Sequence, residues 1–112
     1  MTLDHLPLAI RRALQDYAWR LRDALGARLC DIRLFGSWAR GTASQESDVD
    51  VWVLIDERDA LTERTPISLS TAVLLEHEID ISPLIMDIGE WEFLHARERR
   101  IALDIESEGI AL

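Results

Sequence analysis

Two acidic residues separated by one position form the clearest chemical feature of the sequence. Asp48 and Asp50 stand in a run rich in β-branched residues that predicts a strand over residues 48–55. Side chains of a strand alternate between its faces, so both carboxylates point the same way while the valines beside them face the core. Two carboxylates this close repel each other, and burying them without a partner is costly. Mg²⁺ relieves that repulsion because it prefers hard oxygen ligands, so Asp48 and Asp50 are predicted metal ligands.

A third carboxylate, Asp80, stands between Ile79 and Ile81 in an apolar run. This run predicts a strand over residues 78–86, in which Pro83 indicates an edge position or a bulge. Because the two isoleucines alternate with Asp80, the acid points away from the core face of the strand. If this strand neighbours that of Asp48 and Asp50, three carboxylates converge to hold metal ions and activate an attacking oxygen, as phosphoryl-type transfer requires. The alternative for Asp80 is a half-buried acid that binds no metal.

A glycine–serine pair and an arginine precede these acids and are candidates for phosphate binding. Gly36 allows the backbone to approach a ligand closely, and Ser37 begins a short helical turn whose free N–H groups form an anion site. Arg40 either adds a positive charge to that site or is an ordinary surface residue. The chain contains no Lys, which excludes a Walker-type phosphate loop. Gly36, Ser37 and Arg40 are therefore the predicted nucleotide-binding residues.

The elements around these residues predict an α/β fold, with a small mixed sheet and helices packed against it. Residues 8–25 form an amphipathic helix that ends at Gly26, and residues 28–35 form the strand that leads to Gly36. Residues 42–47 form a loop, and residues 59–77 contain a helix that starts near Pro66, a residue suited to a first turn. From Asp87 a helical pattern runs to Gly109, with four apolar residues on one face: Trp91, Leu94, Ile101 and Ile105.

The burial and roles of several residues outside these motifs can also be predicted. Trp19 falls opposite the apolar stripe of its helix and is expected to be exposed, either as a hot spot for a partner or as an isolated surface aromatic. Trp52 either walls the site or packs under a helix. Cys30 is expected to be a small core residue, because no basic partner that would activate it is apparent. The three histidines show no metal-binding spacing.

Composition bounds the partners and the compartment. The 112 residues predict a single domain over residues 1–112, with little room for a separate acceptor-binding domain. The net charge is −9, which argues against binding a nucleic-acid template, although residues 1–40 carry +3 and residues 41–112 carry −12. No apolar run is long enough for a membrane span, and the first residues lack a signal-peptide pattern. With a single cysteine as well, we expect a cytoplasmic protein without membrane contact.

The spacing of the two motifs resembles a known family signature. Gly36-Ser37, ten residues and then Asp48-Val49-Asp50 is similar to the signature of the DNA polymerase β-like nucleotidyltransferase superfamily, and the short chain resembles its minimal nucleotidyltransferases. The resemblance implies a polymerase β-like fold, ATP as donor and Mg²⁺, with two ions expected. It also implies that Ser37 contacts the triphosphate, that Asp48 and Asp50 hold the metal, and that Asp80 is third ligand and base.

Many minimal nucleotidyltransferases are the antitoxin half of a pair with an all-helical HEPN-type ribonuclease toxin. The resemblance therefore implies transfer of AMP from ATP to a tyrosine of such a toxin. One alternative is a nucleotidyltransferase acting on a small molecule such as an aminoglycoside, for which a homodimer would build the acceptor pocket. The other is a non-enzymatic module that masks the toxin by contact. The intact set of Gly36, Ser37 and the three aspartates argues against a decayed site.

Overall fold

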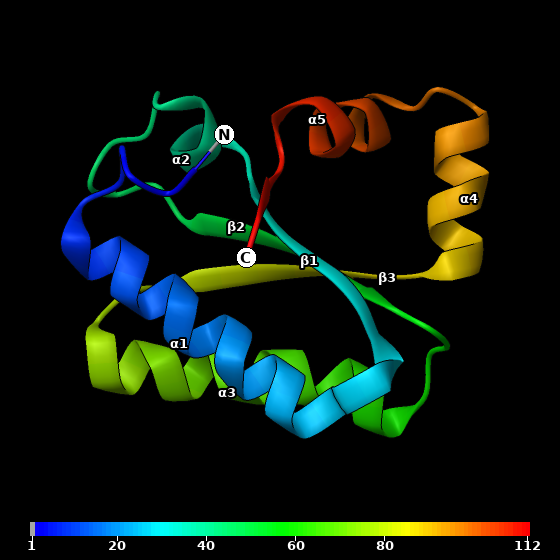
Figure 1. Ribbon diagram of the computed structural model, residues 1–112, viewed down its shortest axis with the longest axis horizontal. Helices are drawn as coiled ribbons and strands as arrows, with labels where there is room; N and C mark the ends of the chain where they lie inside the picture. The colour runs from blue at the N-terminus through cyan, green and yellow to red at the C-terminus, as the bar shows by residue number, and fades with distance from the viewer. Residues whose placement is uncertain (1) are drawn as a thin grey trace.

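Four strands form one mixed sheet with helices packed against it (Figure 1), in a computed structural model that describes residues 2–112. The predicted α/β class and small mixed sheet are confirmed. In chain order the elements are α1 (Leu8–Leu25), the 3₁₀ turn η1 (Gly26–Arg28), β1 (Leu29–Phe35), α2 (Ser37–Arg40), β2 (Val49–Ile55), α3 (Ala60–His77), β3 (Ile81–Asp87), α4 (Ile88–Ala96), α5 (Arg100–Glu108) and β4 (Ile110–Ala111). Within residues 2–112, no helix has the length and apolar character needed to cross a membrane.

The strand order of the sheet is β3-β2-β1-β4. β2 runs parallel to β3 and antiparallel to β1, and β4 pairs antiparallel with β1. β2 is therefore central, between the strand that leads to Gly36 and the strand that follows Asp80. The last residue of β1, Phe35, lies opposite Asp50, and the first residues of β2 and β3, Val49 and Ile81, lie opposite each other. The three predicted site segments thus meet at one end of the sheet.

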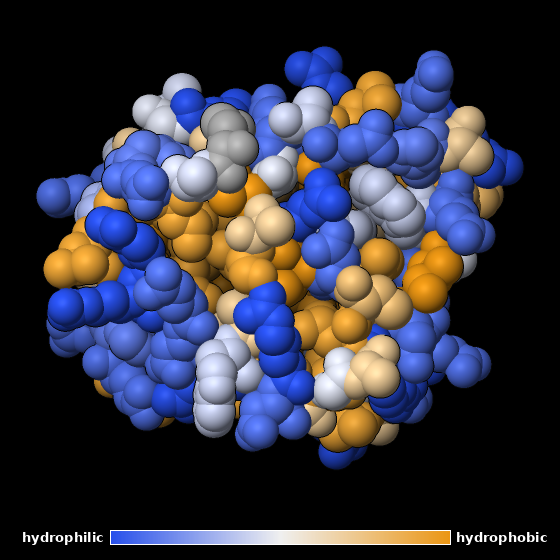
Figure 2. Space-filling model, in the orientation of Figure 1, coloured by the Kyte–Doolittle hydropathy of each residue, from blue (hydrophilic) through white to orange (hydrophobic). Residues whose placement is uncertain are grey.

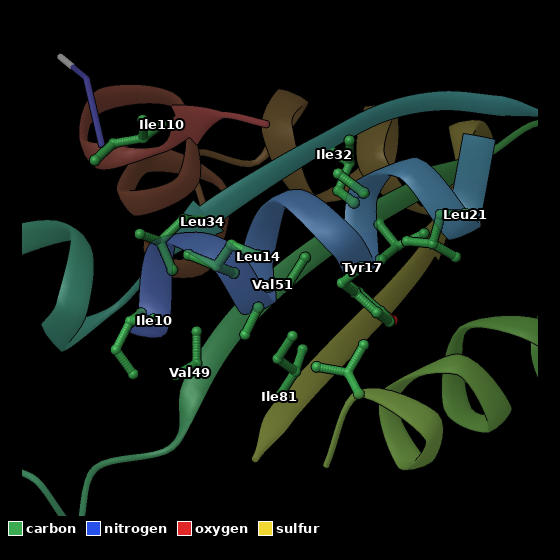
Figure 3. Close-up of a cluster of buried hydrophobic side chains, with 14 of the residues drawn as sticks. Ile10, Leu14, Tyr17, Leu21, Ile32, Leu34, Val49, Val51, Ile81 and Ile110 are labelled. Carbon is green, nitrogen blue, oxygen red and sulfur yellow. The ribbon is translucent and has the colours of Figure 1, made fainter. Parts of the chain in front are cut away.

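Helices α1 and α3 cover one face of this sheet (Figures 1 and 3). The stripe predicted for α1 is buried as a whole, and Figure 3 shows its side chains directed at Ile32, Leu34, Val49 and Val51 of the sheet. The hydroxyl of Tyr17 donates a hydrogen bond of 2.8 Å to the carbonyl oxygen of Pro66, which joins α1 to α3. Burial of apolar side chains on this face stabilises the valine side of β2 and leaves its other face for Asp48 and Asp50.

Helices α4 and α5 cover part of the opposite face. Trp52, Met86 and Ile105 are buried there, and the four apolar residues predicted to share one helical face contribute to the cluster or border it. The ring centroids of Trp52 and Trp91 lie 4.7 Å apart, a distance typical of favourable aromatic pairs. Of the two alternatives for Trp52, the structure therefore supports packing under a helix.

The predicted start of α3 near Pro66 is wrong. The helix begins at Ala60, because Asp59 and Thr62 form a capping box: the Asp59 carboxylate accepts the Thr62 N–H and the Thr62 hydroxyl accepts the Asp59 N–H. Pro66 lies inside the helix, where its ring has no N–H to donate to the turn before it. The predicted edge position of the strand with Pro83 is confirmed, since β3 is an edge strand.

The single helical segment predicted between Asp87 and Gly109 is also wrong in detail. It is split into α4 and α5 by a charged break in which Glu98 has a left-handed φ of 50°. Beyond Gly109 the chain adds β4, a two-residue strand that the sequence did not indicate. Cys30, expected in the core, is exposed, because the register of β1 with β2 shifts between Leu29 and Asp31 and Cys30 falls at this irregularity, outside the alternation that buries Ile32 and Leu34.

Candidate functional site

The turn between β1 and α2 brings the backbone against Asp50. Gly36 has φ +78°, a left-handed value that L residues rarely adopt. A Cβ atom at this position would lie 2.4 Å from Oδ2 of Asp50, so no side chain fits between them. In the first backbone hydrogen bond of the turn, the N–H of Arg40 donates to the carbonyl oxygen of Gly36 at 3.1 Å. The N–H groups of Ser37, Trp38 and Ala39 come before this bond, at the start of the short helix. The structure thus shows Gly36 against Asp50, and the close approach of Gly36 to a ligand stays a prediction.

Trp38, for which the sequence indicates no role, holds the loop between α2 and β2. Its indole Nε1 donates to the carbonyl oxygen of Ser47 at 3.0 Å, directly before Asp48. The Ser47 hydroxyl accepts the N–H of Ser44 at 3.0 Å, which closes the loop on itself. A ring nitrogen of His5 lies 3.0 Å from the Trp38 carbonyl oxygen and ties the N-terminal segment to α2. These contacts fix the entry of β2 relative to Gly36.

Asp50 is half-buried at the start of β2, and Asp48, just before the strand, is exposed. Burial raises the pKa of the Asp50 carboxyl, and the negative charge of Asp48 raises it further; the positive charge of Arg40 opposes both. Asp48 and Arg40 thus act on the Asp50 carboxyl with opposite sign. A bound cation between the two carboxylates would favour their charged forms.

Asp80 lies immediately before β3 and is exposed. Its carbonyl oxygen accepts the N–H of Val49 at 3.1 Å, and Asp48 and Asp80 directly precede Val49 and Ile81, the first partners of the β2–β3 register. Ile81 faces the core with Val49, so Asp80 shares the other face of the sheet with Asp50. The register also places the exposed Ser82 opposite Asp50. Sequence reasoning missed Ser82, although its position two residues after Asp80 indicates the same face.

The ligand atoms of Asp48, Asp50 and Asp80 do not all lie within 4.8 Å of one another. Among residues 2–112, one group has three His, Cys, Asp or Glu ligand atoms within 4.8 Å of one another, and it is Asp16, Glu76 and His77. That group is built around Arg20, which bonds Asp16 at 2.9 Å and Glu76 at 2.6 Å and holds the pKa of Asp16 below its usual value. It joins α1 to α3 as an ion-pair network.

Arg40 has a partner that the sequence did not indicate. Its Nη1 donates to Oε2 of Glu108, at the end of α5, at 3.1 Å. Arg40 also borders an open hollow of about 650 Å³ between α2 and the N-terminal segment, within the size range of small-molecule sites. No spacing rule connects residues 40 and 108, since their proximity follows from the pairing of β4 with β1.

Comparisons with known proteins show what the chain is similar to. The sequence profile of a nucleotidyltransferase domain matches residues 20–111. A Methanocaldococcus jannaschii protein that carries the provisional name protein adenylyltransferase is 34% identical over 79 residues, which are 70% of this chain and 80% of the relative.

Two solved structures share the fold. A crystal structure of a toxin–antitoxin with AMP-PNP aligns with a TM-score of 0.58 at 23% identity, over 87% of this chain and 69% of that chain. A mutant of the toxin–antitoxin MntA-HpeT aligns with a TM-score of 0.56 at 24% identity, over 88% of this chain and 70% of that chain.

Proposed function

Because the chain belongs to the nucleotidyltransferase domain family, we propose that it transfers the AMP group of ATP to a hydroxyl of a partner protein. The acceptor we propose is a tyrosine of a helical HEPN-type toxin, for which this chain is the antitoxin. The names of the relatives support a protein acceptor, and the toxin–antitoxin neighbours support the kind of partner. The compartment we propose is the cytoplasm, which supplies ATP.

The observation that carries this proposal is the meeting of two motifs at one end of the sheet. Gly36 lies against Asp50, while Asp48 and Asp80 directly precede the first partners of the β2–β3 register. Donors for phosphate oxygens therefore stand beside carboxylates of the kind that hold a divalent cation. We assign triphosphate contacts to Gly36, Ser37 and Arg40.

The donor set fits a divalent metal ion. Asp48 and Asp50 supply carboxylate oxygens, Asp50 half-buried against the backbone of Gly36, and Asp80 is the candidate third ligand. When bound, Mg²⁺ supplies positive charge that neutralises the triphosphate and polarises its α-phosphorus.

The chain's own residues then have two tasks, to orient the triphosphate and to accept a proton. The turn at Gly36 and Ser37 orients the triphosphate so that its α-phosphorus faces the acceptor. The hydroxyl oxygen of the acceptor forms a bond to the α-phosphorus, the bond from that phosphorus to the bridging oxygen breaks, and pyrophosphate leaves. The hydroxyl proton passes to a carboxylate oxygen of Asp80, which is exposed and able to reach an incoming protein.

The test is intact-mass spectrometry of the partner encoded beside this chain, after incubation of the two purified proteins with ATP and Mg²⁺. A gain of one adenylyl group, or a multiple of it, is expected, and it should disappear with Asp48→Ala. Glu46→Ala is the matched control, because it removes an exposed acid from the same loop without touching the proposed ligands. Circular dichroism of Asp48→Ala checks that the fold is intact.

The other outcomes separate the remaining functions. A stable complex without a mass gain would favour an antitoxin that masks its toxin by contact. Neither a complex nor a mass gain would favour a small-molecule acceptor such as an aminoglycoside. Retained transfer by a purified Asp48→Ala, Asp50→Ala double variant would sink the assignment of the metal site.

A further inference from the structure

Glu108 touches a residue assigned to the triphosphate while lying outside the proposed site. Its Oε2 accepts a hydrogen bond of 3.1 Å from Arg40, the last residue of α2. Arg40 is close enough to Asp50 to lower the pKa of that carboxyl. Glu108 therefore places a negative charge beside the guanidinium of Arg40, the group assigned to phosphate contact.

Two neighbours fix the backbone of Glu108. Ile105, fully buried, anchors the last turn of α5 against the sheet. Gly109 packs so closely that a Cβ atom would lie 2.3 Å from the Ile105 carbonyl oxygen and 3.0 Å from Cδ of Arg33. Ile110 then pairs with Leu34 of β1, the strand that leads into Gly36. The segments that carry Glu108 and Arg40 are thus attached to the same strand.

The contact itself can open without disturbing the core. The Arg40 and Glu108 side chains are 43% and 30% exposed, so their charged ends can part while the backbone stays in place. Phosphate and carboxylate oxygens use the same guanidinium donors, so both cannot bind one edge of Arg40 at once.

We propose that Glu108 holds Arg40 in the nucleotide-free protein and competes with the triphosphate for it, and thereby sets the affinity for ATP. This inference rests on the proposed function, in which Arg40 binds phosphate. When Arg40 turns to the nucleotide, the Glu108 carboxylate loses its ion pair and remains near the bound phosphates. Removal of its charge therefore favours the nucleotide-bound state.

The experiment is calorimetric titration of AMP-PNP with Mg²⁺ into the intact chain and four variants. Glu108→Gln is expected to tighten binding by about 2- to 5-fold, the range typical of one partly exposed ion pair. Glu106→Gln is the matched control: it removes the same charge from the same helix, but its carboxylate lies against His95. Arg40→Ala is expected to weaken binding, and Glu108→Gln is expected to have no further effect in that background.

A transfer assay provides a second measurement. A positioning role predicts that Glu108→Gln lowers the KM for ATP and leaves kcat unchanged, whereas a change that loosens the fold would lower kcat as well. Thermal melting of the variant checks its stability separately.

The results separate this inference from the proposed function. If the parent chain binds AMP-PNP but Glu108→Gln binds no tighter than Glu106→Gln, the competition is overturned and the proposed function stands. Equal tightening by Glu108→Gln with and without Arg40 would also overturn it, because the effect would then not pass through Arg40. If the parent chain does not bind AMP-PNP at all, the proposed function and this inference fail together.

Discussion

At the residue scale, the site depends on a glycine that touches a carboxylate. Gly36 combines a positive φ with a close approach to Asp50, and both conditions exclude a side chain. Gly41, five residues later, has nearly the same φ of 77°, but a Cβ atom at that position would meet nothing within 4 Å. The two glycines differ in ψ, which is −157° at Gly36 and 20° at Gly41, so an alanine at position 36 would carry more backbone strain as well as the collision with Asp50.

Gly36→Ala is expected to lower kcat about 100-fold, because the methyl group displaces the Asp50 carboxylate from its position. Gly41→Ala is expected to cost about 1 kcal/mol of unfolding free energy through its φ alone and to keep most of the activity. Urea unfolding and the transfer assay measure the two effects. Equal activities of the two variants would show that contact between Gly36 and Asp50 does not matter for transfer.

The charge of Asp50 predicts a dependence of stability on pH. Its raised pKa means that the folded state keeps the proton more tightly than the unfolded chain does, so the free energy of unfolding falls as pH rises from about 4 through that pKa. Asp50→Asn removes this loss. The variant is expected to be more stable than the parent at pH 7, and the difference should vanish well below pH 4, as measured by urea unfolding at each pH.

Added Mg²⁺ gives a second test of the Asp50 charge, because a ligand that binds only the folded state stabilises that state. Added Mg²⁺ should raise the melting temperature of the parent and leave that of Asp50→Asn nearly unchanged. An advantage of the variant that stays the same at pH 3 and pH 7 would contradict the role given to the Asp50 charge.

The residues of the site were predictable to the extent that their chemistry is local. Gly36, Ser37, Asp48 and Asp50 stand close together in the sequence, and strand alternation predicts the shared face of the two acids. The placement of Asp80 and Asp48 directly before neighbouring strands needs the parallel register, and the contact of Glu108 with Arg40 needs β4. Sequence spacing carries no information on either pairing.

At the element scale, the residues that begin and end each helix explain which helix bounds the sequence predicts correctly and which it does not. The bounds of α1 match the prediction because its apolar stripe and Gly26 agree. The start of α3 was misplaced because Pro66 was given more weight than the capping box of Asp59 and Thr62. α4 and α5 share a buried face, so periodicity alone does not detect the left-handed Glu98 that separates them.

Removal of the α3 cap tests this account. Asp59→Ala is expected to destabilise the protein by about 1 kcal/mol, since the Thr62 N–H loses its acceptor and Arg28 loses an ion pair. Glu63→Ala, which removes an acid from the same first turn without a capping bond, is expected to cost less than about 0.5 kcal/mol. Urea unfolding compares the two, and equal costs would mean that charge rather than capping stabilises the turn.

At the scale of the whole molecule, the outer side of α1 differs from the acidic remainder. Trp19 is 64% exposed, as predicted, and borders a hollow of about 320 Å³ with Arg22 and Leu112. Arg12 lies two turns before Trp19 on the same side of the helix. Figure 2 shows apolar surface between charged side chains in the middle of this view, where Figure 1 places the C-terminus. An exposed Trp among arginines is the composition typical of a protein contact.

Trp19→Ala is expected to weaken binding of the partner at least tenfold and to leave the affinity for AMP-PNP unchanged. Leu75→Ala is the comparison, because it removes another exposed apolar side chain, 80% exposed, from α3 instead of α1. Titration calorimetry with the partner measures both. Loss of binding with Leu75→Ala alone would move the interface from α1 to α3.

The short β4 has a consequence for how the sheet meets other molecules. It pairs only with Arg33 and Leu34, so the first half of β1 has no strand on that side. There the Asp31 carboxylate accepts the N–H of Ile32 at 2.8 Å and is paired with Arg33 at 2.9 Å. An incoming strand would have to displace a charged group from the backbone donor it needs. The side chain of Asp31 therefore opposes fibril-like pairing of one molecule with the next along the unpaired half of β1.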